Sequence, residues 1–594
     1  MTCGTDGTDG LGAPMARTTA TAVRRALGLV VVLVLTALSA ACASIPTSGP
    51  VVEGAAEPAA PLPIFLSPNP PPDDASPEQI VSGFLSAQGA GTTSDYDVAR
   101  AYLSSAASEW DPSVTVTVYE GDPGLEIAEE PVEGSATVTG TVSVVGTIDD
   151  RGIYSEVRDG TTADLSFGLE QDDEGRWRIS DAEDGLLIQS GIFPILYQQT
   201  TLYFPTPDRR YFVPDERWFP KSPKWQTFAV SAVLAGPAPW LQDAVVNVAP
   251  PGTTLLLQTV PVSDGVATVN LSAAVQSASA EDRSLLQAQI QAVVVGSYPR
   301  TQLFESIRSV QLTSEGTAID VDTVDPLPTA TVVGDAVAVS GGELMSVDGS
   351  TLRAVDGAPS LAGTDPTAIA VDGDLAAGGS ATVYVRDGDD FIVALGPDGA
   401  PESALFDGRD LVAPSVDRFG WVWSGPAEGT LSAVSGEGER AGIAAPWLDD
   451  VTLLAVEVAP DGARAVVVTS APGGPQVRVT GIVRDESGRP TSLTTPVRIA
   501  PSVVDVLDVS WTDDTKVAVL GRSGGEDSAV VQLAVVGGQT TALSRVPETV
   551  ALTAGNGERT ILVLDDKGVL YGRSESATIW VPQASDVDLV TYPE

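Results

Sequence analysis

The sequence predicts a multidomain protein with an N-terminal α+β domain, a second small α+β domain and a C-terminal all-β propeller. Three observations predict this fold class. A capped helix and then alternating strands follow residue 76, and a hairpin pattern with a helix precedes residue 325. From about residue 330 the chain consists of short strands and Gly/Asp turns in units of about 35 to 50 residues, the length of a four-stranded propeller blade.

Residues 1–41 have the composition of an export signal, with Met15 as the predicted start because the preceding segment is acidic. Arg24 and Arg25 precede an uncharged apolar run that ends in small residues directly before Cys42. A basic segment, an apolar core and small residues are the three parts of such a signal. A cysteine in the next position is typical of bacterial lipoproteins. We therefore expect the Cys42 thiol to carry acyl chains such as palmitate, at the extracytoplasmic face of the cell membrane.

The signal departs from the usual lipoprotein pattern at Ser39, where leucine is common, because Leu38 lies one residue early. An uncleaved transmembrane helix over Ala26 to Ile45 is the alternative, since a segment of that length just spans a bilayer. Both interpretations make the rest of the chain an exported protein tethered to the membrane.

Residues 42–75 form a predicted Pro-rich tether. Ten prolines lie between residues 43 and 77, with few apolar side chains among them. Proline favours the extended polyproline II conformation, in which this length of chain reaches roughly 100 Å at ~3.1 Å per residue. An unstructured leader would have a similar composition, so the reach of the tether is a hypothesis.

Composition excludes several kinds of chemistry. The chain has no histidine, the commonest general base and metal ligand, and its only cysteines are Cys3 and Cys42. Thiol catalysis, histidine triads, haem attachment and zinc fingers are therefore excluded. A formal charge of −47 argues against nucleic acid, whose binding requires a basic face. We expect no catalytic residue, no metal and no cofactor.

The first α+β domain is predicted over residues 76–195. Ser76, Pro77 and Gln79 form a capping-box helix start, and the apolar residues that follow fall on one helical face. A second helix is expected from Ser94, and alternating apolar residues then predict antiparallel strands. The residues that carry these patterns are Ile80, Val81, Phe84 and Leu85 on one face of the first helix, Val98, Ala99, Tyr102 and Leu103 as the buried stripe of the second, and Val114, Val116, Val118, Val138, Val142, Val144, Leu165, Phe167, Leu169, Trp177 and Ile179 in the strands.

The second domain is predicted over residues 196–325 and opens with an aromatic stretch between prolines. Such a stretch is typical of an irregular strand pair whose rings fill a core, and sugar binding is the alternative. A helix is expected next, with Trp225, Phe228, Ala229 and Ala232 facing inward and a stop at Gly236-Pro237. The aromatic residues of the stretch are Tyr197, Tyr203, Phe204, Tyr211, Phe212, Trp218 and Phe219.

The remainder of the second domain is predicted to contain a hairpin, a helix and a final strand. The hairpin joins strands Thr254–Val260 and Gly265–Leu271 through Ser263-Asp264-Gly265. The helix spans Asp282–Val294, and the final strand spans Ile307–Thr313.

These motifs resemble the GerMN domain of spore germination and sporulation proteins, over roughly residues 225–315. Asn270 stands where members of that family usually carry aspartate before Leu-Ser. The resemblance implies a small module with no established catalytic residue. It lies in Val233-Leu234-Ala235-Gly236-Pro237, Pro251-Gly252-Thr253, the run from Gly265 to Ser272, and Gln287-Ala288-Gln289-Ile290.

The propeller is predicted over residues 330–594. Phrases around Asp417, Asp461 and Asp513-Asp514 each consist of an apolar strand, a polar turn and a second apolar strand. Radial repetition explains how so many strands avoid exposed edges, and two packed sandwiches are the alternative. The expected units begin near Val332, Ala368, Ser415, Ala455, Val506 and Ala551.

The order of these parts and the run from Cys42 to Val51 resemble the LpqB lipoprotein family of actinobacteria over essentially the full chain. The resemblance implies a lipid-anchored protein whose partner is the extracytoplasmic part of the sensor histidine kinase MtrB, which phosphorylates the response regulator MtrA. It also implies that the protein modulates this pair and thereby affects cell-envelope homeostasis and division. The kinase partner follows from the resemblance alone.

Two other functions remain open. Hydrolysis would need paired carboxylates, but neighbouring carboxylates on turns more often cap backbone amides. Exposed tryptophans could bind cell-wall glycans or peptides, whereas tryptophans in propeller strands more often fill gaps between blades. The acidic clusters are Asp172-Asp173-Glu174, Glu183-Asp184, Asp387 with Asp389-Asp390, and Asp513-Asp514, and the tryptophans are Trp421, Trp423, Trp447 and Trp511.

Overall fold

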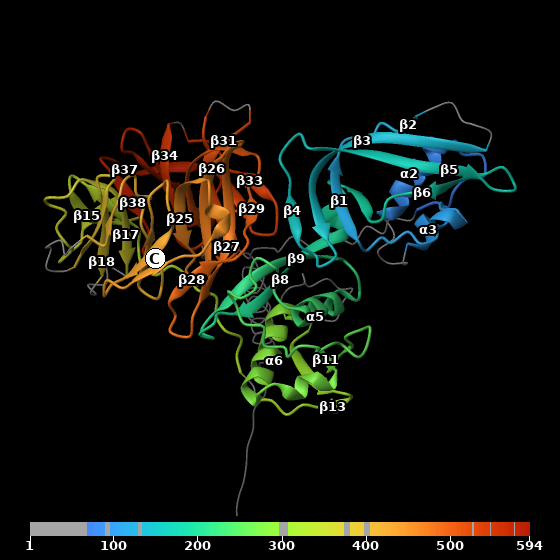
Figure 1. Cartoon of the computed structure of the whole chain (residues 1–594), viewed down its shortest axis with the longest axis horizontal. Coiled ribbons are helices and arrows are strands. Elements are labelled where there is room, and N and C mark those ends of the chain that lie inside the picture. The colour runs from blue at the N-terminus through green and yellow to red at the C-terminus, as the bar shows by residue number, and fades with distance from the viewer. Residues whose placement is uncertain are drawn as a thin grey trace, which may run out of the picture. The chain divides into compact units, whose positions relative to one another are not determined.

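The computed structural model describes residues 68–594, except residues 90–95, 129–133, 296–306, 323, 374–380, 397–403, 525–527, 547 and 575. They belong to one compact unit, Leu62–Glu594. The predicted export signal, Cys42 and most of the predicted tether lie outside the described residues, so they stay predictions. Strands predominate throughout, and the longer helices belong to the first two domains (Figure 1).

In the first domain, helices lie against a seven-stranded sheet (Figure 1). The strand order is β6-β5-β3-β1-β7, with β2 and β4 pairing with β3. Strands β1 and β7 are parallel to each other, whereas the other pairs are antiparallel. The elements are α2 (Pro77–Gln88), α3 (Asp97–Arg100), η3 (Ser105–Ala107), β1 (Thr115–Glu120), β2 (Glu126–Ile127), β3 (Ser135–Asp149), β4 (Tyr154–Glu156), β5 (Thr162–Gln171), β6 (Trp177–Asp181) and β7 (Leu186–Gln189).

The predicted capping box at the start of α2 is confirmed. The Gln79 amide donates to Ser76 Oγ, and the Ser76 amide donates to Gln79 Oε1 at 2.9 Å. All four apolar residues predicted for the inner face of this helix are buried. Gly83 allows the helix to approach Tyr102, because a Cβ at this position would lie 2.5 Å from the tyrosine ring.

Two predictions for this domain are wrong in detail. The second helix, α3, is only four residues long, and its predicted start at Ser94 lies outside the described residues. Tyr96 precedes α3 with a φ of 61°, a left-handed conformation that a right-handed helix cannot include. Val114 is 48% exposed because β1 begins one residue later.

The second domain combines a two-stranded hairpin, two main helices and a four-stranded sheet of order β10-β11-β12-β13. Strands β11 and β12 are parallel, and α6 lies in the connection between them (Figure 1). The elements are α4 (Phe193–Leu196), β8 (Tyr197–Pro205), β9 (Phe212–Pro220), α5 (Trp225–Ala235), β10 (Val262–Ser263), β11 (Val266–Leu271), η4 (Ala273–Ser277), α6 (Ala280–Val294), β12 (Ser309–Ser314) and β13 (Thr317–Ala318).

The aromatic stretch forms the β8–β9 hairpin, and its rings fill cores as predicted. Phe204, Phe212 and Phe219 belong to the largest hydrophobic cluster, and Tyr197 belongs to that of the first domain. The predicted inward position of Phe228 is wrong, since this side chain is 39% exposed. The buried face of α5 instead runs through Trp225, Ala229, Val230 and Val233.

The predicted strand Thr254–Val260 is also wrong. Only Leu255 in this range forms a bridge, to Leu271, and the strand that pairs with β11 is the short β10. Pro261 directly precedes β10 and has no amide to donate, so the ladder does not continue upstream. The turn itself is confirmed, because Asp264 and Gly265 have positive φ values of 54° and 76°, as a tight hairpin turn requires.

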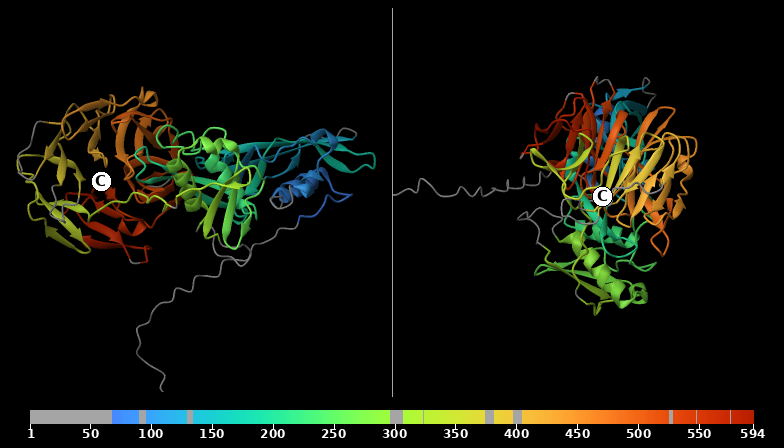
Figure 2. Two further views of the ribbon diagram at one scale, coloured as in Figure 1. Left: turned by 90° about the horizontal axis from the view of Figure 1, so that it is seen from below. Right: turned by 90° about the vertical axis from the view of Figure 1, so that its left-hand side faces the viewer.

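The third domain contains six sheets within the described residues, arranged radially around an axis (Figure 2). Five have four strands and one has five. The strands are β14 (Val337–Ser340), β15 (Glu343–Asp348), β16 (Thr351–Ala354), β17 (Pro366–Asp372), β18 (Thr382–Asp387), β19 (Phe391–Leu395), β20 (Phe406–Asp407), β21 (Ser415–Val416), β22 (Trp421–Ser424), β23 (Ser432–Ser435), β24 (Arg440–Gly442), β25 (Thr452–Val458), β26 (Arg464–Ala471), β27 (Gly474–Arg484), β28 (Pro490–Leu493), β29 (Val497–Ile499), β30 (Val503–Trp511), β31 (Lys516–Ser523), β32 (Val530–Val535), β33 (Thr540–Ala542), β34 (Thr549–Thr553), β35 (Leu562–Asp565), β36 (Leu570–Arg573), β37 (Trp580–Ala584) and β38 (Leu589–Thr591).

The ring of blades closes through β38, which pairs with β14 of the first blade. One blade is therefore built from both ends of the domain. Around the axis, side-chain oxygens connect innermost strands that do not pair with each other. The Val458 amide donates to Ser415 Oγ of the preceding blade at 3.0 Å, and the Ala554 amide donates in the same way to Ser510 Oγ at 3.1 Å. The predicted propeller is confirmed, and the alternative of two sandwiches is wrong.

The recurring aspartates lie in the turns between the first two strands of a blade. Asp417 Oδ1 accepts the Phe419 and Trp421 amides, and Oδ2 accepts Trp423 Nε1 at 2.8 Å. The same carboxylate pairs with Arg484, so its charge is compensated although it is fully buried. The recurring aspartate therefore has a structural role at this turn, because it accepts the turn amides and forms an ion pair.

Candidate functional site

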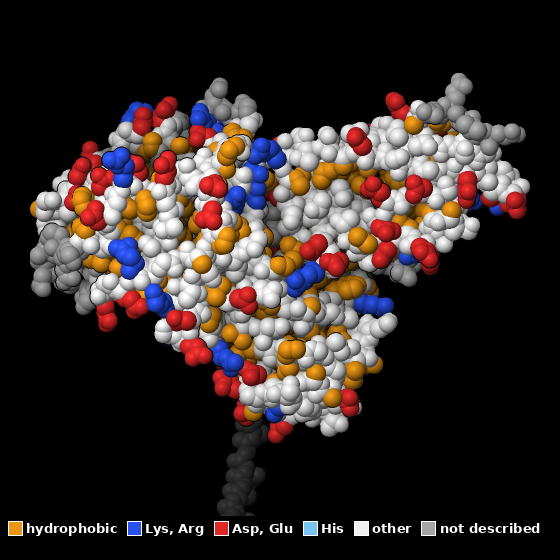
Figure 3. Space-filling model, in the orientation of Figure 1, with side chains coloured by type: hydrophobic (Ala, Val, Ile, Leu, Met, Phe, Trp, Pro, Cys, Tyr) orange, Lys and Arg blue, Asp and Glu red, His pale blue; other side chains and the backbone are white. Residues whose placement is uncertain are grey.

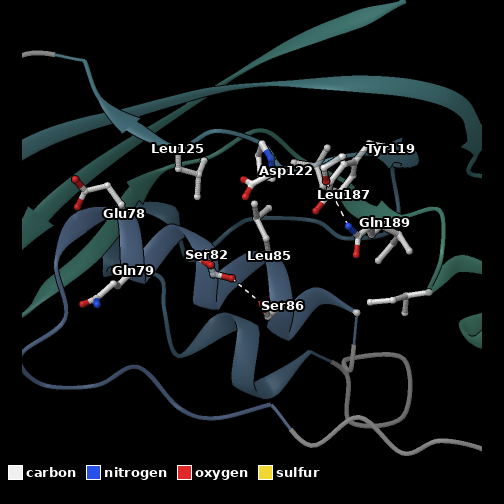
Figure 4. Close-up of a pocket in the computed structure, with 15 residues that line it drawn as sticks. Glu78, Gln79, Ser82, Leu85, Ser86, Tyr119, Asp122, Leu125, Leu187 and Gln189 are labelled. Atoms are coloured by element: carbon white, nitrogen blue, oxygen red, sulfur yellow. Dashed lines mark hydrogen bonds between the residues drawn. The ribbon is translucent and has the colours of Figure 1, made fainter. Parts of the chain in front are cut away.

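A groove of about 610 Å³ opens in the first domain between α2 and the sheet (Figure 4). The face of α2 that carries Ser82, Leu85 and Ser86 forms one wall, where Ser86 Oγ donates to the Ser82 carbonyl at 2.9 Å. The opposite wall comes from the end of β1, the loop that follows it and β7. Leu125 and Leu187 on this side lie across from Leu85.

Polar and apolar side chains line the groove in nearly equal numbers. Glu78 and Asp122 are the charged side chains of its lining, which includes no lysine or arginine. Gln189 Nε2 donates to the Gly121 carbonyl at 3.3 Å, which fixes the loop after β1 (Figure 4). Burial raises the pKa of the Tyr119 hydroxyl, and the charge of Asp122 adds to this effect. A concave site that combines apolar side chains with polar groups can hold a ligand or a peptide.

The second candidate site is the central channel of the propeller, a cavity of about 420 Å³ lined by the innermost strands. Three carboxylates line it, those of Glu457, Asp508 and Glu594. Each accepts hydrogen bonds of 2.5 to 3.2 Å from an innermost strand of another blade. The donors are the Ser510 hydroxyl and Trp511 amide for Glu457, the Leu552 amide for Asp508, and the Ser415 hydroxyl and Val416 amide for Glu594.

Burial raises the pKa of all three carboxyls, because an ionised carboxylate loses hydration deep inside the propeller. The pKa of Asp508 rises to about 6 and that of Glu594 to about 8, and that of Glu457 rises well above its ordinary range. The negative charge of Glu594 adds to the effect at Glu457. The three side chains retain some accessible surface, so they lie deep in the molecule but face the channel.

Sequence reasoning did not identify these carboxylates. The available signal was an acidic residue within an apolar strand, as in Val456-Glu457-Val458 and Leu507-Asp508-Val509. A buried strand position normally excludes an unpaired carboxylate, so such an exception indicates a special environment.

The acidic clusters considered from the sequence are turn residues, as interpreted. Each contains a carboxylate that accepts a backbone amide, and the clusters lie on separate turns, two of them in the sheet of the first domain and two in different blades of the propeller. The bonds run from the Glu174 and Arg176 amides to Asp172, from the Asp111 amide to Asp184, from the Asp365 amide to Asp387, from the Asp410 amide to Asp390, and from the Thr515 amide to Asp513.

The tryptophans considered for glycan stacking contribute to packing between blades. Trp421, Trp423 and Trp511 are buried, and Trp447 is half-buried. Trp421 and Trp423 share a hydrophobic cluster with the innermost strand of the next blade. The Arg464 guanidinium lies 4.7 Å from the centre of the Trp511 ring. The predicted packing role of these rings is confirmed.

Among the residues that the structure describes, no group of three or more Asp, Glu, His or Cys side chains could hold a metal ion. No helix in the same part of the chain is long and apolar enough to cross a membrane. Acidic side chains are scattered over the visible face rather than gathered in one patch (Figure 3).

Polar contacts also join the domains. Glu156 in β4 accepts the Thr540 amide of the propeller at 2.9 Å, and burial raises the pKa of this carboxyl despite the bond. Asp208 in the second domain forms two bonds of 2.8 and 2.9 Å with Arg418 of the propeller. The three domains therefore share ionic and hydrogen-bonded contacts.

The three domains define a class of multidomain lipoproteins, because family models match each of them and two of these models describe lipoprotein domains. They are the lipoprotein LpqB N-terminal domain at residues 70–194, the sporulation and spore germination module at residues 201–320, and the lipoprotein LpqB beta-propeller domain at residues 342–592. The chain belongs to the LpqB lipoprotein family. This membership supports an extracytoplasmic lipoprotein.

Several relatives in that family are similar over most of the chain. Lipoprotein LpqB of Cutibacterium acnes is 28% identical over 90% of this chain and 94% of its own. The protein of Bifidobacterium longum is 26% identical over 86% of this chain and 88% of its own. That of Streptomyces coelicolor is 26% identical over 93% and 94%.

Proposed function

We propose that this protein is anchored to the extracytoplasmic face of the cell membrane through acyl chains on Cys42, and that it binds the sensor kinase MtrB. Through this contact it modulates the MtrA–MtrB two-component system and thereby cell-envelope homeostasis and division. The family supports the class of protein, and the groove between α2 and β7 is the observation that carries the binding role.

The groove suits a partner near the membrane because it belongs to the first folded domain after the tether. Its helical wall, α2, begins at Pro77, about 35 residues after Cys42. The leucines and isoleucines of its lining offer apolar area for an inserted side chain, and its two carboxylates favour a partner without excess negative charge at that point.

Anchoring makes a weak interaction sufficient. Confinement beside a membrane protein raises the effective concentration of the groove, so the affinity of the contact does not need to be high. Binding changes signalling only if the groove contacts one state of the kinase more favourably than another.

We propose a binding role without catalysis. The carboxylates of the acidic clusters are engaged in turn closure, and the chain contains no histidine. The alternative of a glycan-binding lipoprotein is weaker, because three of the four candidate tryptophans are buried and do not offer a stacking face.

The groove is tested with Ser82→Arg, which fills it from an exposed position on α2 without removing a core side chain. We expect this variant to bind the soluble extracytoplasmic part of MtrB at least about tenfold more weakly in calorimetry, since it blocks the apolar wall. Ser105→Arg is the matched control, because Ser105 is exposed in the same domain and does not line the groove. Equal affinities of both variants for MtrB would contradict the groove as the docking site.

The anchor is tested separately with Cys42→Ala in cells. We expect this variant to be released from the membrane and MtrA phosphorylation to change as it does when the protein is deleted. An unchanged MtrA phosphorylation level with fully released protein would contradict the tethering mechanism.

A further inference from the structure

Four innermost strands of the propeller share an irregularity in their pairing. The register shifts by one residue once in β17, β25 and β34 and twice in β30, and each extra residue lies between two paired positions. A bulge of this kind redirects a side chain and is common at functional rims. The residues at these shifts that also line the channel are Thr367, Leu454, Leu507 and Val550.

Three of these residues form an apolar collar, which we define as Leu454, Leu507 and Val550. They come from three consecutive blades and are 42%, 49% and 49% exposed. The collar and the channel carboxylates line the same cavity. Exposed aliphatic side chains next to an internal cavity provide favourable contacts for an apolar partner.

The channel behind the collar holds carboxyl groups whose negative charge, once they ionise, no basic side chain that the structure describes compensates. Among the described residues, the hydrogen bonds of Glu457 use Oε1 and those of Glu594 use Oε2, so each carboxylate retains one oxygen without a donor. No basic side chain lowers the pKa of either group or of Asp508.

Other charged groups near the channel do not change this balance. Arg386 and Arg418 line it, but Arg386 lies 3.7 Å from Asp389 and Arg418 pairs with Asp208. Asp372 and Asp417 both raise the pKa of Glu594, although Arg484 pairs with Asp417.

We propose that the propeller channel binds a short peptide segment of a partner protein in which a lysine or arginine is flanked by apolar residues. The basic side chain enters the channel and donates to the carboxylate oxygens, and the flanking residues pack on the collar. This site is separate from the groove and does not depend on the kinase as the partner.

An apolar collar next to carboxylates favours a basic side chain with apolar neighbours over a metal ion or a small polyamine. A metal ion would need several converging oxygens, which the described residues do not provide, and an apolar collar adds nothing to its binding. A cationic side chain also favours ionised carboxylates, so binding releases protons and becomes tighter as pH rises.

The test measures fluorescence anisotropy of three labelled peptides with blocked ends: Val-Leu-Lys-Leu-Val, and the same peptide with Gln or with Glu in the centre. The protein is the full chain with Cys42→Ala, which avoids detergent. We expect the Lys peptide to bind at least about tenfold more tightly than the Gln peptide, because its bonds are charge-assisted. We also expect no binding of the Glu peptide, and tighter binding of the Lys peptide at pH 8 than at pH 6.

Two variants test the channel carboxylates and the apolar collar separately. Glu457→Gln and Leu507→Ser should each weaken binding of the Lys peptide about tenfold, a change worth 1.4 kcal/mol. Val581→Ser is the matched control, because Val581 is 42% exposed on an outer strand and does not line the channel. The proposal is overturned if the three peptides bind equally, if none binds at millimolar concentration, if spermidine binds as tightly as the Lys peptide, or if Leu507→Ser matches Val581→Ser.

Discussion

The groove of the first domain and the channel of the propeller have comparable volumes, about 610 and 420 Å³, but different physical character. The groove lies between a helix and a sheet, and its walls are held by apolar packing. The channel lies between strands of separate blades, and carboxylates and hydroxyls connect those strands across it. We therefore expect the groove to select a partner by shape and the channel to select one by charge.

This difference predicts different responses to solution conditions. Apolar contacts in the groove depend little on salt, whereas attraction of a cation to the channel is screened. Carboxyls with raised pKa values also make the propeller sensitive to pH in the range where they ionise. We therefore expect the groove and the channel to respond separately to salt and to pH.

The largest effect is expected from Arg484→Ala in the propeller. Arg484 and Asp417 are bonded at 2.5 Å, and their side chains are 2% and 0% exposed. Removing the arginine leaves a buried charge without a partner, which costs about 3–5 kcal/mol of unfolding free energy. Urea unfolding followed by tryptophan fluorescence measures this loss.

Arg353→Ala is the control, because the Arg353–Asp348 pair is exposed and worth less than about 1 kcal/mol. If Arg484→Ala and Arg353→Ala cost the same, the buried pair does not stabilise the propeller.

The second effect concerns pH. The pKa of Asp508 is about 6 in the folded protein and near 3.8 in the unfolded chain, so the folded state binds this proton more tightly. Its protonation therefore favours folding at low pH, and this contribution is lost as pH rises from about 4 to about 6. The loss is at most about 3 kcal/mol, because one pKa unit corresponds to about 1.4 kcal/mol and channel solvent reduces the effect.

Asp508→Asn should flatten the pH profile of the unfolding free energy over this range. Leu507→Ala is the control, since it changes the adjacent residue without removing a titrating group. Parallel profiles for the native protein and Asp508→Asn would show that Asp508 does not contribute.

The third effect tests the groove. Leu85 is buried in the wall of α2 but borders the open groove. Leu85→Ala should cost about 2 kcal/mol, at the low end for such a change, because part of the space that it leaves joins the groove. We expect this cost to be the same at pH 4 and pH 7 and at low and high salt. If the loss of unfolding free energy in Leu85→Ala changed with pH as it does in Asp508→Asn, the groove and the channel would not differ in their response to pH.

Local patterns in the sequence were sufficient to predict the elements whose determinants are neighbours in the chain. The α2 start depends on Ser76 and Gln79, the β10–β11 turn on Asp264-Gly265, and the blade turns on aspartates a few residues from their donors. The prediction failed for Thr254–Val260 because apolar composition suggested a strand, whereas pairing depended on the proline that follows it.

The two sites could not be predicted because each is assembled from distant segments. The groove lies between α2 and β7, which follows about 100 residues later in the chain. The carboxylates of the channel belong to separate blades, and they face one cavity only because the blades close into a ring. The bulges that expose the collar add one residue to a strand and so disrupt the alternation on which strand prediction depends. A single sequence therefore predicts the blades better than the channel between them.

The smallest effect is expected from Ser76→Ala at the start of α2. Ser76 Oγ accepts the Gln79 amide, and this bond satisfies one of the unpaired donors of the first helical turn. Its loss should cost about 1 kcal/mol. Hydrogen exchange of the α2 amides measures the loss locally, and faster exchange should be confined to the first domain. Ser76→Asp is the matched control, because aspartate also caps a helix and its charge is favourable at the helix start. If the alanine variant also accelerates exchange in β25 or β30, the groove and the channel are energetically coupled, and the two sites do not act as separate regions.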